Sequence, residues 1–381
     1  MKKIIIIGAN NFQNSLILKA KEKGYETHVF AWKCGDVGEK TADFFYPISI
    51  VEKEKIWTEA KKIKPDAVAS IASDLAVITV NYVARGLGLV ANSEWSDMVS
   101  TNKYNMRQAM SKYGVVCPWY CKLQQGEKIE NITSLKYPLI VKPTDRSGSR
   151  GIRKVDCYEE LCDAVANAQM LSFENTAIVE EFIEGKEYSC ECISYDGVHH
   201  MLAITEKFTT GEPHFIEIGH MQPANITEKM QGYIRQIVFN ALDALHIEYG
   251  ASHTEFKIDN CGEIRIIEVG ARMGGDCIGS HLVQMSTGND FVGMVIDVAS
   301  GKQPEIKSFK SKKNAAIRFI MDKNDLSLMD KLNKNFQITE IVTLSDKYEE
   351  KVTDSSTRYG YFLIFGTSQE KIERKLFTKK V

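Results

Sequence analysis

Residues 249–275 read YGASHTEFKIDNCGEIRIIEVGARMGG, and this stretch predicts a β-hairpin. The first half, residues 251–258, alternates between polar and apolar side chains, as a half-buried strand does. Residues 259–262 are turn formers, and residues 264–269 supply the returning strand. The hairpin therefore decides how the acidic residues on its two strands face one another.

In the register that this turn implies, Asp259 pairs with Ile264 and Glu255 lies directly opposite Glu268. Two carboxylates that face each other across a strand pair repel, unless both ligate a cation. Mg²⁺ is the usual choice where phosphates supply the remaining oxygens, and Arg272 would then hold a phosphate oxygen. The alternative is an ordinary exposed strand pair, in which a shift of one residue moves one carboxylate to the other face.

The composition is that of a globular protein with room for two or three domains. The chain has 381 residues, of which 44% are hydrophobic and 26% are charged. Its formal net charge of −2 disfavours nucleic acid as a partner. Nine cysteines without a C-x-x-C pair indicate a reducing compartment. The apolar run Ile4–Ile7 is too short for a signal peptide or a membrane span, so we expect a cytoplasmic protein without a membrane partner.

The chain up to about residue 90 alternates strands and helices, which predicts an open parallel sheet. Its first turn, GANNFQNS at residues 8–15, lacks the G-x-G-x-x-G spacing of a dinucleotide site. Ser70, Ser73 and Asp74 follow a buried strand at the edge where open sheets place ligands. We favour the alternative that these residues cap the next helix.

The periodicity of the whole chain predicts the following elements. Strands are expected at 3–8, 26–31, 45–50, 67–71, 137–142, 177–182, 188–195, 315–321, 338–344 and 361–365, besides the hairpin. Helices are expected at 14–23, 52–64, 76–87, 103–112, 158–171, 227–246, 278–300 and from residue 368, with a polar loop at 209–226.

A second candidate site follows the strand that ends at Lys142. The loop Ser147-Gly148-Ser149-Arg150-Gly151 is small and flexible, so its N–H groups suit an anion, and the lysine adds a point charge. The spacing is not that of a P-loop. An ordinary surface turn is the alternative reading of the loop.

A third candidate site is the segment 180–183, Glu-Glu-Phe-Ile, with Glu187 beyond it. An extended segment between two lobes can bind a purine edge through its backbone while apolar side chains enclose the ring. A carboxylate just beyond such a segment can accept hydrogen bonds from ribose hydroxyls. The alternative is a strand end followed by a charged turn.

The three sites in this order resemble the ATP-grasp superfamily, through YPLIVKPTDRSGSRGI, VEEFIEGKEYS and HTEFKID…IIEVGARMGGD. The resemblance extends from Lys3 to about Gly301. It implies an α/β fold with a pre-ATP-grasp domain of open parallel sheet at 1–95. A two-lobed α+β ATP-grasp domain would follow at 96–304, with an ATP lobe at about 115–195 and a metal lobe at about 196–304. A small C-terminal α+β unit would occupy 305–381.

The resemblance also implies how this chain would bind ATP. The phosphates would contact Lys103 and Lys142, and the loop of Ser147, Gly148, Ser149 and Gly151 would close over the γ-phosphate. Adenine would be bound by Glu180 and by the backbone of Glu181, Phe182 and Ile183. Ribose would be bound by Glu187.

The remaining implied roles concern the metal and the substrates. Glu255 and Glu268 would hold Mg²⁺, with Mn²⁺ as the other candidate, and Arg272 would bind the transferred phosphate. Many members of the superfamily carry Asn two residues after the second carboxylate, where this chain has Gly270. The E-V-G-A-R form resembles the branch that contains L-amino acid ligases and the pyrrolysine-pathway ligase. His220, in a motif similar to that branch, would orient substrate or accept the amine's proton. His253, two residues before Glu255, is expected to support that carboxylate.

The resemblance implies an ATP-dependent ligase that joins a small-molecule carboxylate to an amine through an acylphosphate. One alternative is a carboxylase or a carbamoyl-phosphate-synthase-like enzyme that uses bicarbonate. A second alternative is an ATP-binding protein without turnover. The C-terminal unit is a candidate surface for a homodimer.

Overall fold

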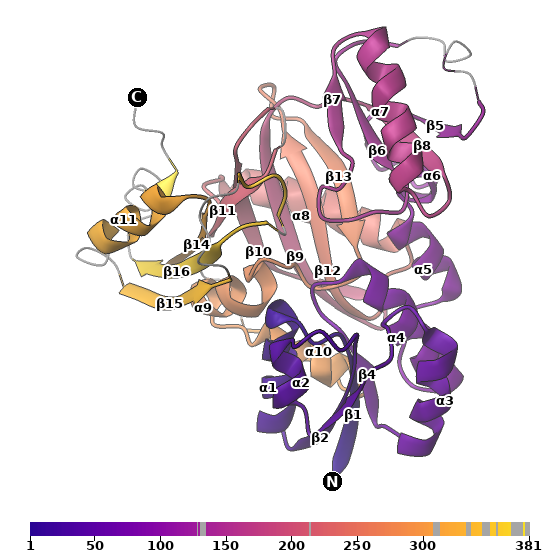
Figure 1. Ribbon diagram of the computed structural model, residues 1–381, viewed down its shortest axis with the longest axis vertical. Coiled ribbons are helices and arrows are strands. Elements are labelled where there is room, and N and C mark those ends of the chain that lie inside the picture. Colours follow the sequence, from indigo (N-terminus) through magenta and orange to yellow (C-terminus); the bar gives the residue numbers. More distant parts are fainter. Residues whose placement is uncertain are drawn as a thin grey trace.

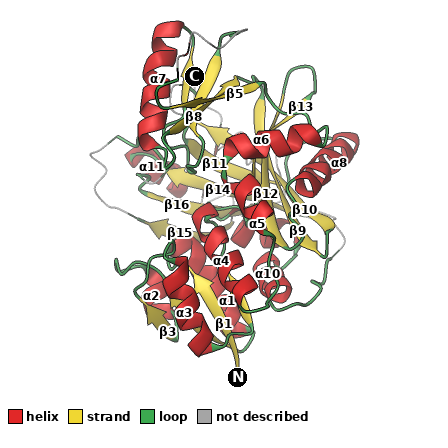
Figure 2. Ribbon diagram, turned by 90° about the vertical axis from the view of Figure 1, so that its right-hand side faces the viewer, coloured by secondary structure: helices red, strands yellow, loops and turns green. Residues whose placement is uncertain are grey.

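The computed structural model of the chain describes residues 1–127, 129, 135–212, 215–307, 313–332, 337–344, 351–355, 357–366 and 376–377. An N-terminal unit lies at one end of the molecule and a lobe that contains α7 lies at the other (Figures 1 and 2). A large central sheet runs between them. No helix within the described ranges is both long and apolar enough to cross a bilayer.

The N-terminal unit is a parallel sheet with the strand order β3-β2-β1-β4, which confirms the predicted open sheet. Its strands are β1 (Lys2–Ile7), β2 (Tyr25–Phe30), β3 (Phe44–Tyr46) and β4 (Ala67–Ala69). Its helices are α1 (Asn11–Glu22), α2 (Val37–Thr41), α3 (Lys53–Ile63) and α4 (Asp74–Gly86). Ile4 and Ile6 of β1 belong to one hydrophobic cluster and Ile5 and Ile7 to another, because successive strand residues point to opposite faces. Both faces are therefore buried.

The lobe with α7 is an antiparallel sheet with the order β5-β8-β6-β7. Its elements, with the two helices that lead into it, are α5 (Glu94–Thr101), α6 (Lys103–Lys112), β5 (Tyr120–Gln124), β6 (Leu139–Pro143), β7 (Arg153–Val155), α7 (Tyr158–Leu171) and β8 (Thr176–Glu181). Leu161, Val165 and Ala168 of α7 pack on the sheet in a cluster of their own. The lobe thus has a separate core.

The central sheet has eight strands in the order β13-β12-β9-β10-β11-β14-β16-β15. Its strands are β9 (Lys186–Tyr195), β10 (Val198–Thr209), β11 (Glu217–Gln222), β12 (Gly250–Ile258), β13 (Ile264–Gly270), β14 (Asn314–Ile320), β15 (Gln337–Thr343) and β16 (Gly360–Gly366). The helices are α8 (Glu228–Ala244), a π-helix (Ile278–Leu282), α9 (Val283–Thr287), α10 (Phe291–Ala299) and α11 (Lys323–Leu332). The C-terminal strands β14 to β16 extend the sheet that carries the hairpin. The domain boundaries expected after residues 95 and 304 remain predictions.

Three expectations need correction or lie outside the described residues. The predicted polar loop 209–226 contains β11, because residues 219–222 pair with residues 315–318 of β14. The predicted helix 278–300 is wrong as one element, since Gly288 adopts a φ of 78° and ends α9 before α10 begins. The predicted helix from Ser368 falls mainly outside the described residues.

Candidate active site

One cleft of about 490 Å³ is lined by residues of the N-terminal unit, the α7 lobe, the central sheet and the segment that precedes β16. It brings together nearly all the residues that the sequence analysis singled out. These are Lys103, Lys142, Ser147, Gly148, Ser149, Glu180, Glu181, Phe182, Ile183, Glu187, His220, Glu255, Glu268 and Arg272. Gly151 is not among the lining residues, and a Cβ there would lie 2.7 Å from Leu171, so this glycine is needed for packing behind the loop.

The hairpin places Glu255 opposite Glu268, as predicted. The predicted pair of Asp259 with Ile264 is wrong, because Ile264 pairs with Ile258 at the turn. A β-bulge between residues 255 and 256 then shifts the register by one residue and restores the carboxylate pair. Both side chains line the cleft.

The carboxylate pair fits a metal only with help from a ligand. Among the described residues there is no group of three or more His, Cys, Asp or Glu side chains that could hold an ion. Glu268 instead accepts a hydrogen bond from Lys103 at 2.8 Å, and Glu255 accepts one from Lys207 at 2.7 Å. Two carboxylates leave most oxygen positions around Mg²⁺ to phosphate and water, which suits a site that forms with a bound nucleotide.

Glu180, which is predicted to contact adenine, is paired with two cations inside the protein. It is wholly buried, and its two oxygens accept hydrogen bonds from Arg107 at 2.6 Å and Lys142 at 2.7 Å. Burial alone would raise the pKa of Glu180, but the two cations outweigh it and lower the pKa to about 2. Glu180 thus holds Lys142 in the cleft.

The predicted adenine segment lies at the end of β8. The backbone N–H groups of Glu181 and Phe182 donate to the carbonyls of Trp119 and Pro138. Lys257 donates to the carbonyl of Ile183 at 3.0 Å, and its Nζ lies 4.8 Å from the Phe182 ring. Two of the segment's N–H groups are therefore already used within the protein.

Arg272 forms a two-pronged ion pair with Asp74, at 2.8 and 3.1 Å. Desolvation opposes both charges, but each partner outweighs it, so the pKa of Asp74 is lowered and that of Arg272 is raised. Of the three residues that we expected to cap α4, Ser73 does so, whereas Ser70 donates to the carbonyl of Ile7 and Asp74 lines the cleft. Asp74, in the first turn of α4, is thus a residue of the N-terminal unit that fixes an arginine of the cleft.

Gly270 has a steric role that the sequence comparison with Asn did not show. A Cβ at this position would lie 2.8 Å from Asp74 Oδ1 and 3.2 Å from Arg272 Nε. A side chain there would therefore collide with the ion pair.

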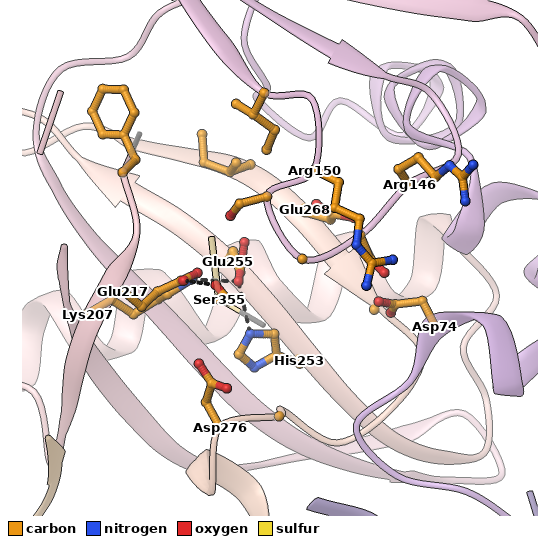
Figure 3. Close-up of a pocket in the computed structure, with 18 of the residues that line it drawn as sticks. Asp74, Arg146, Arg150, Lys207, Glu217, His253, Glu255, Glu268, Asp276 and Ser355 are labelled. Atoms are coloured by element: carbon orange, nitrogen blue, oxygen red, sulfur yellow. Dashed lines mark hydrogen bonds and ion pairs between the residues drawn. The ribbon is translucent and has the colours of Figure 1, made fainter. Parts of the chain in front are cut away.

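Lys207 lies among three carboxylates, and the sequence analysis missed it. Its Nζ is 2.8 Å from Glu187, 2.7 Å from Glu255 and 3.9 Å from Glu217. Desolvation lowers the pKa of Lys207, but the three carboxylates raise it well above its usual value. In the view of Figure 3, His253, Glu255 and Glu268 lie between Asp74 on one side and Lys207 with Glu217 on the other. Lys207 follows Glu206 near the polar end of β10, so the strand pattern alone does not single it out.

The two histidines of the cleft are in opposite charge states. Burial lowers the pKa of His220 despite Asp276, which lies 3.4 Å from its Nε2, so His220 is neutral near pH 7. Burial alone would lower the pKa of His253 as well, but the Glu191 carboxylate outweighs this effect and raises the pKa of His253 to about 9. His253 hydrogen-bonds Glu191 and, at 3.3 Å, Glu255, which agrees with the expected supporting position.

Comparisons with known proteins show what this chain is similar to. Residues 135–280 match the family model described as "ATP-grasp domain". The "Uncharacterized protein y4rH" of Sinorhizobium fredii is 26% identical over 66% of this chain and 53% of its own length. A D-alanine–D-alanine ligase of Flavobacterium johnsoniae is 25% identical over 63% of this chain and 76% of its own length. The chain thus spans about half the length of the first relative.

Solved structures show the same fold over nearly the whole chain. The L-amino acid ligase from Bacillus licheniformis superposes with a TM-score of 0.84 and 22% identity, covering 98% of this chain and 95% of that one. At this identity the likeness concerns the fold.

Proposed function

Because the chain carries an ATP-grasp domain, we propose that it is an ATP-dependent ligase that joins a small carboxylate to an amine through an acylphosphate. The observation that supports this most is the convergence of Glu255, Glu268, Lys103, Lys142 and Arg272 on one cleft. These are the charges that transfer of the γ-phosphoryl group to a carboxylate requires.

The two lysines that would contact the phosphates are each paired with a carboxylate inside the protein. Lys103 pairs with Glu268, Lys142 with Glu180. We propose that the phosphate oxygens of bound ATP accept hydrogen bonds from Lys103 and Lys142. Glu268 then no longer pairs with Lys103 and can ligate a metal ion. Mg²⁺ held there would neutralise charge on the transferring group.

The carboxylate substrate is a poor electrophile because its leaving group would be oxide. Phosphorylation gives it a good leaving group, and alignment of the two reactants accounts for much of the rate. Arg272, fixed by Asp74, faces the same cleft and would bind the acylphosphate. Neutral His220 is able to accept the proton of the amine.

The substitution Glu268→Ala tests the proposal. We expect the fold to persist and carboxylate-dependent ADP release to fall by about 100-fold or more, because a charge that acts on the transferring group is lost. Glu263→Ala is the matched control, because Glu263 lies at the hairpin turn, pairs with Arg265 and does not line the cleft. Full Mg²⁺-dependent activity in Glu268→Ala would refute the site.

The same assay separates the alternatives. ADP and phosphate release would be measured with pooled amino acids and with bicarbonate alone. Release that needs amino acids supports the ligase, and release with bicarbonate alone points to a carboxylase. ATP binding without release in either case points to a protein that only binds ATP.

A further inference from the structure

One end of the cleft holds a group of polar and charged side chains that the proposed ATP site does not use. We name this group the acceptor cluster. Its members are Glu217, His220, Asp276, Ser355 and Arg358, and all of them line the cleft. They come from β11, from the segment after β13 and from the segment before β16, so no single stretch of sequence contains the cluster.

Arg358 is the centre of the acceptor cluster. Its residue is only 5% exposed, and its guanidinium lies 3.7 Å from the Phe319 ring centroid. It donates to Asp276 at 2.9 Å and to the carbonyl of Ser355 at 2.8 Å. Its remaining nitrogen is 3.9 Å from Glu217, which is too long for a hydrogen bond. The arginine is thus fixed by two hydrogen bonds, and its third nitrogen has no hydrogen bond to the described residues.

The residues around Arg358 show two features that are typical of a binding site, one in the backbone and one in a side chain. Asp276 and Cys277 both have positive φ, 53° and 60°, and a π-helix follows them. Such backbone strain is concentrated at functional sites. His220 is 1% exposed, and its Nδ1 has no hydrogen-bond partner among the described residues. A buried polar atom of this kind is expected to find a partner in a ligand.

The charges of the acceptor cluster match a zwitterion. Arg358 offers a planar fork that suits a carboxylate, whereas Asp276 and Glu217 offer acceptors for an ammonium. The opposite charges are adjacent, as they are in a molecule that has both groups on one carbon. We infer that the acceptor cluster binds the amine substrate as a free α-amino acid, with its carboxylate on Arg358 and its ammonium on Asp276 and Glu217. This inference rests on the proposed ligase function.

The position of His220 beside Asp276 fits the reaction that would follow. The ammonium loses one proton to His220, and the nitrogen lone pair then forms the C–N bond to the acyl carbon of the acylphosphate. The C–O bond to phosphate breaks, and phosphate leaves with the electron pair. The second proton of the amine passes to the departing phosphate, which is released as HPO₄²⁻, and His220 returns its proton to solvent.

The test separates the two half-reactions in the full-length chain. Hydroxylamine replaces the amine in the first assay, so hydroxamate formation from each candidate acid reports the acylphosphate alone. The second assay measures product with two matched sets of three acceptors. One set is glycine, glycinamide and methylamine, and the other is alanine, alaninamide and ethylamine. We expect kcat/KM to be higher by about 30-fold or more for the two amino acids than for the amides and the simple amines. The amides and amines have no carboxylate to pair with the Arg358 guanidinium.

Arg358→Gln should raise KM for the amino acid acceptor by about 30-fold or more and leave hydroxamate formation within about twofold. Arg358→Lys, which keeps the charge, should restore part of the affinity. Arg318→Gln is the matched control, because Arg318 forms a similar buried pair with Asp325, at 2.7 Å, but does not line the cleft.

Each outcome bears on one of the two proposals. Equal use of amides and amino acids by the unaltered protein would overturn the acceptor assignment, even if the Arg358 variants fail to fold. An equal loss of hydroxamate and ligation in Arg358→Gln would also overturn it. Absence of hydroxamate with every acid, despite ATP binding, would instead refute the ligase function.

Discussion

Glu180 shows how one residue sets the position of two cations. Its carboxylate, at the end of β8, is hydrogen-bonded to Arg107 of α6 and Lys142 of β6, and none of the three side chains is appreciably exposed. Removal of one member of a buried ion pair leaves a charge without compensation, which is strongly destabilising. Glu180 therefore contributes to stability and to the geometry of the cleft.

We predict that Glu180→Gln lowers the free energy of unfolding by about 3 kcal/mol at pH 7. The pKa of Glu180 is about 2, below its ordinary value of 4.5, so its contribution is present above pH 4.5 and is lost as the pH falls toward 2. The difference between variant and unaltered protein should therefore shrink across this window in urea titrations.

The neighbouring Glu181 provides the control for that experiment. Glu181 is exposed, so Glu181→Gln should change the free energy of unfolding by no more than about 0.5 kcal/mol. A difference for Glu180→Gln that stays constant from pH 7 to pH 3 would contradict the assignment of the lowered pKa.

At the scale of elements, the connection between β8 and β9 brings the predicted adenine segment against the hairpin. Gly185 in this connection has a φ of 134°, and a Cβ there would lie 2.3 Å from the carbonyl oxygen of Ile258 at the end of β12. Only glycine allows this approach. The same contact keeps Ile183 within reach of Lys257.

We predict that Gly185→Ala weakens binding of MgADP by about tenfold or more, because the added methyl group displaces the segment from β12. Calorimetry with the full-length chain would measure the dissociation constant. Gly197→Ala is the control: Gly197 also has a positive φ, 72°, but a Cβ there would meet nothing within 4 Å. Equal weakening in both variants would mean that backbone strain, and not displacement, is responsible.

At the scale of the molecule, α10 unites the N-terminal unit with the central sheet. Phe291, Val295 and Ile296 of α10 share one hydrophobic cluster with Ile4 of β1 and Leu202 of β10. The α7 lobe, in contrast, has a hydrophobic cluster of its own. The ion pair of Asp74 with Arg272 thus lies across a rigid contact.

Phe291 is only 1% exposed, so we predict that Phe291→Ala lowers the free energy of unfolding by about 3–5 kcal/mol. Hydrogen exchange should then rise together in peptides from β1 and β9, because both depend on the shared cluster, and stay unchanged in α7. Val165→Ala, in the core of the lobe, should instead raise hydrogen exchange in α7 and leave it unchanged in β1 and β9. Unchanged protection of β1 in Phe291→Ala would show that the N-terminal unit is stable without α10.

The sequence by itself determined the chemistry that lies within short segments. The hairpin alternation brought Glu255 opposite Glu268, although the bulge that makes this pair possible was not visible in the pattern. The parallel sheet and the cap at Ser73 also follow from local signals, because strand periodicity and capping involve residues only a few positions apart.

Only the tertiary structure decided the partners of these residues. Asp74 and Arg272 are 198 positions apart, and Asp276 and Arg358 are 82 positions apart. Nothing in the local periodicity links such residues, because their contact depends on how whole sheets and helices pack. For the same reason β11 was predicted as loop: its pairing with β14 supplies the hydrogen bonds that its own polar sequence does not suggest.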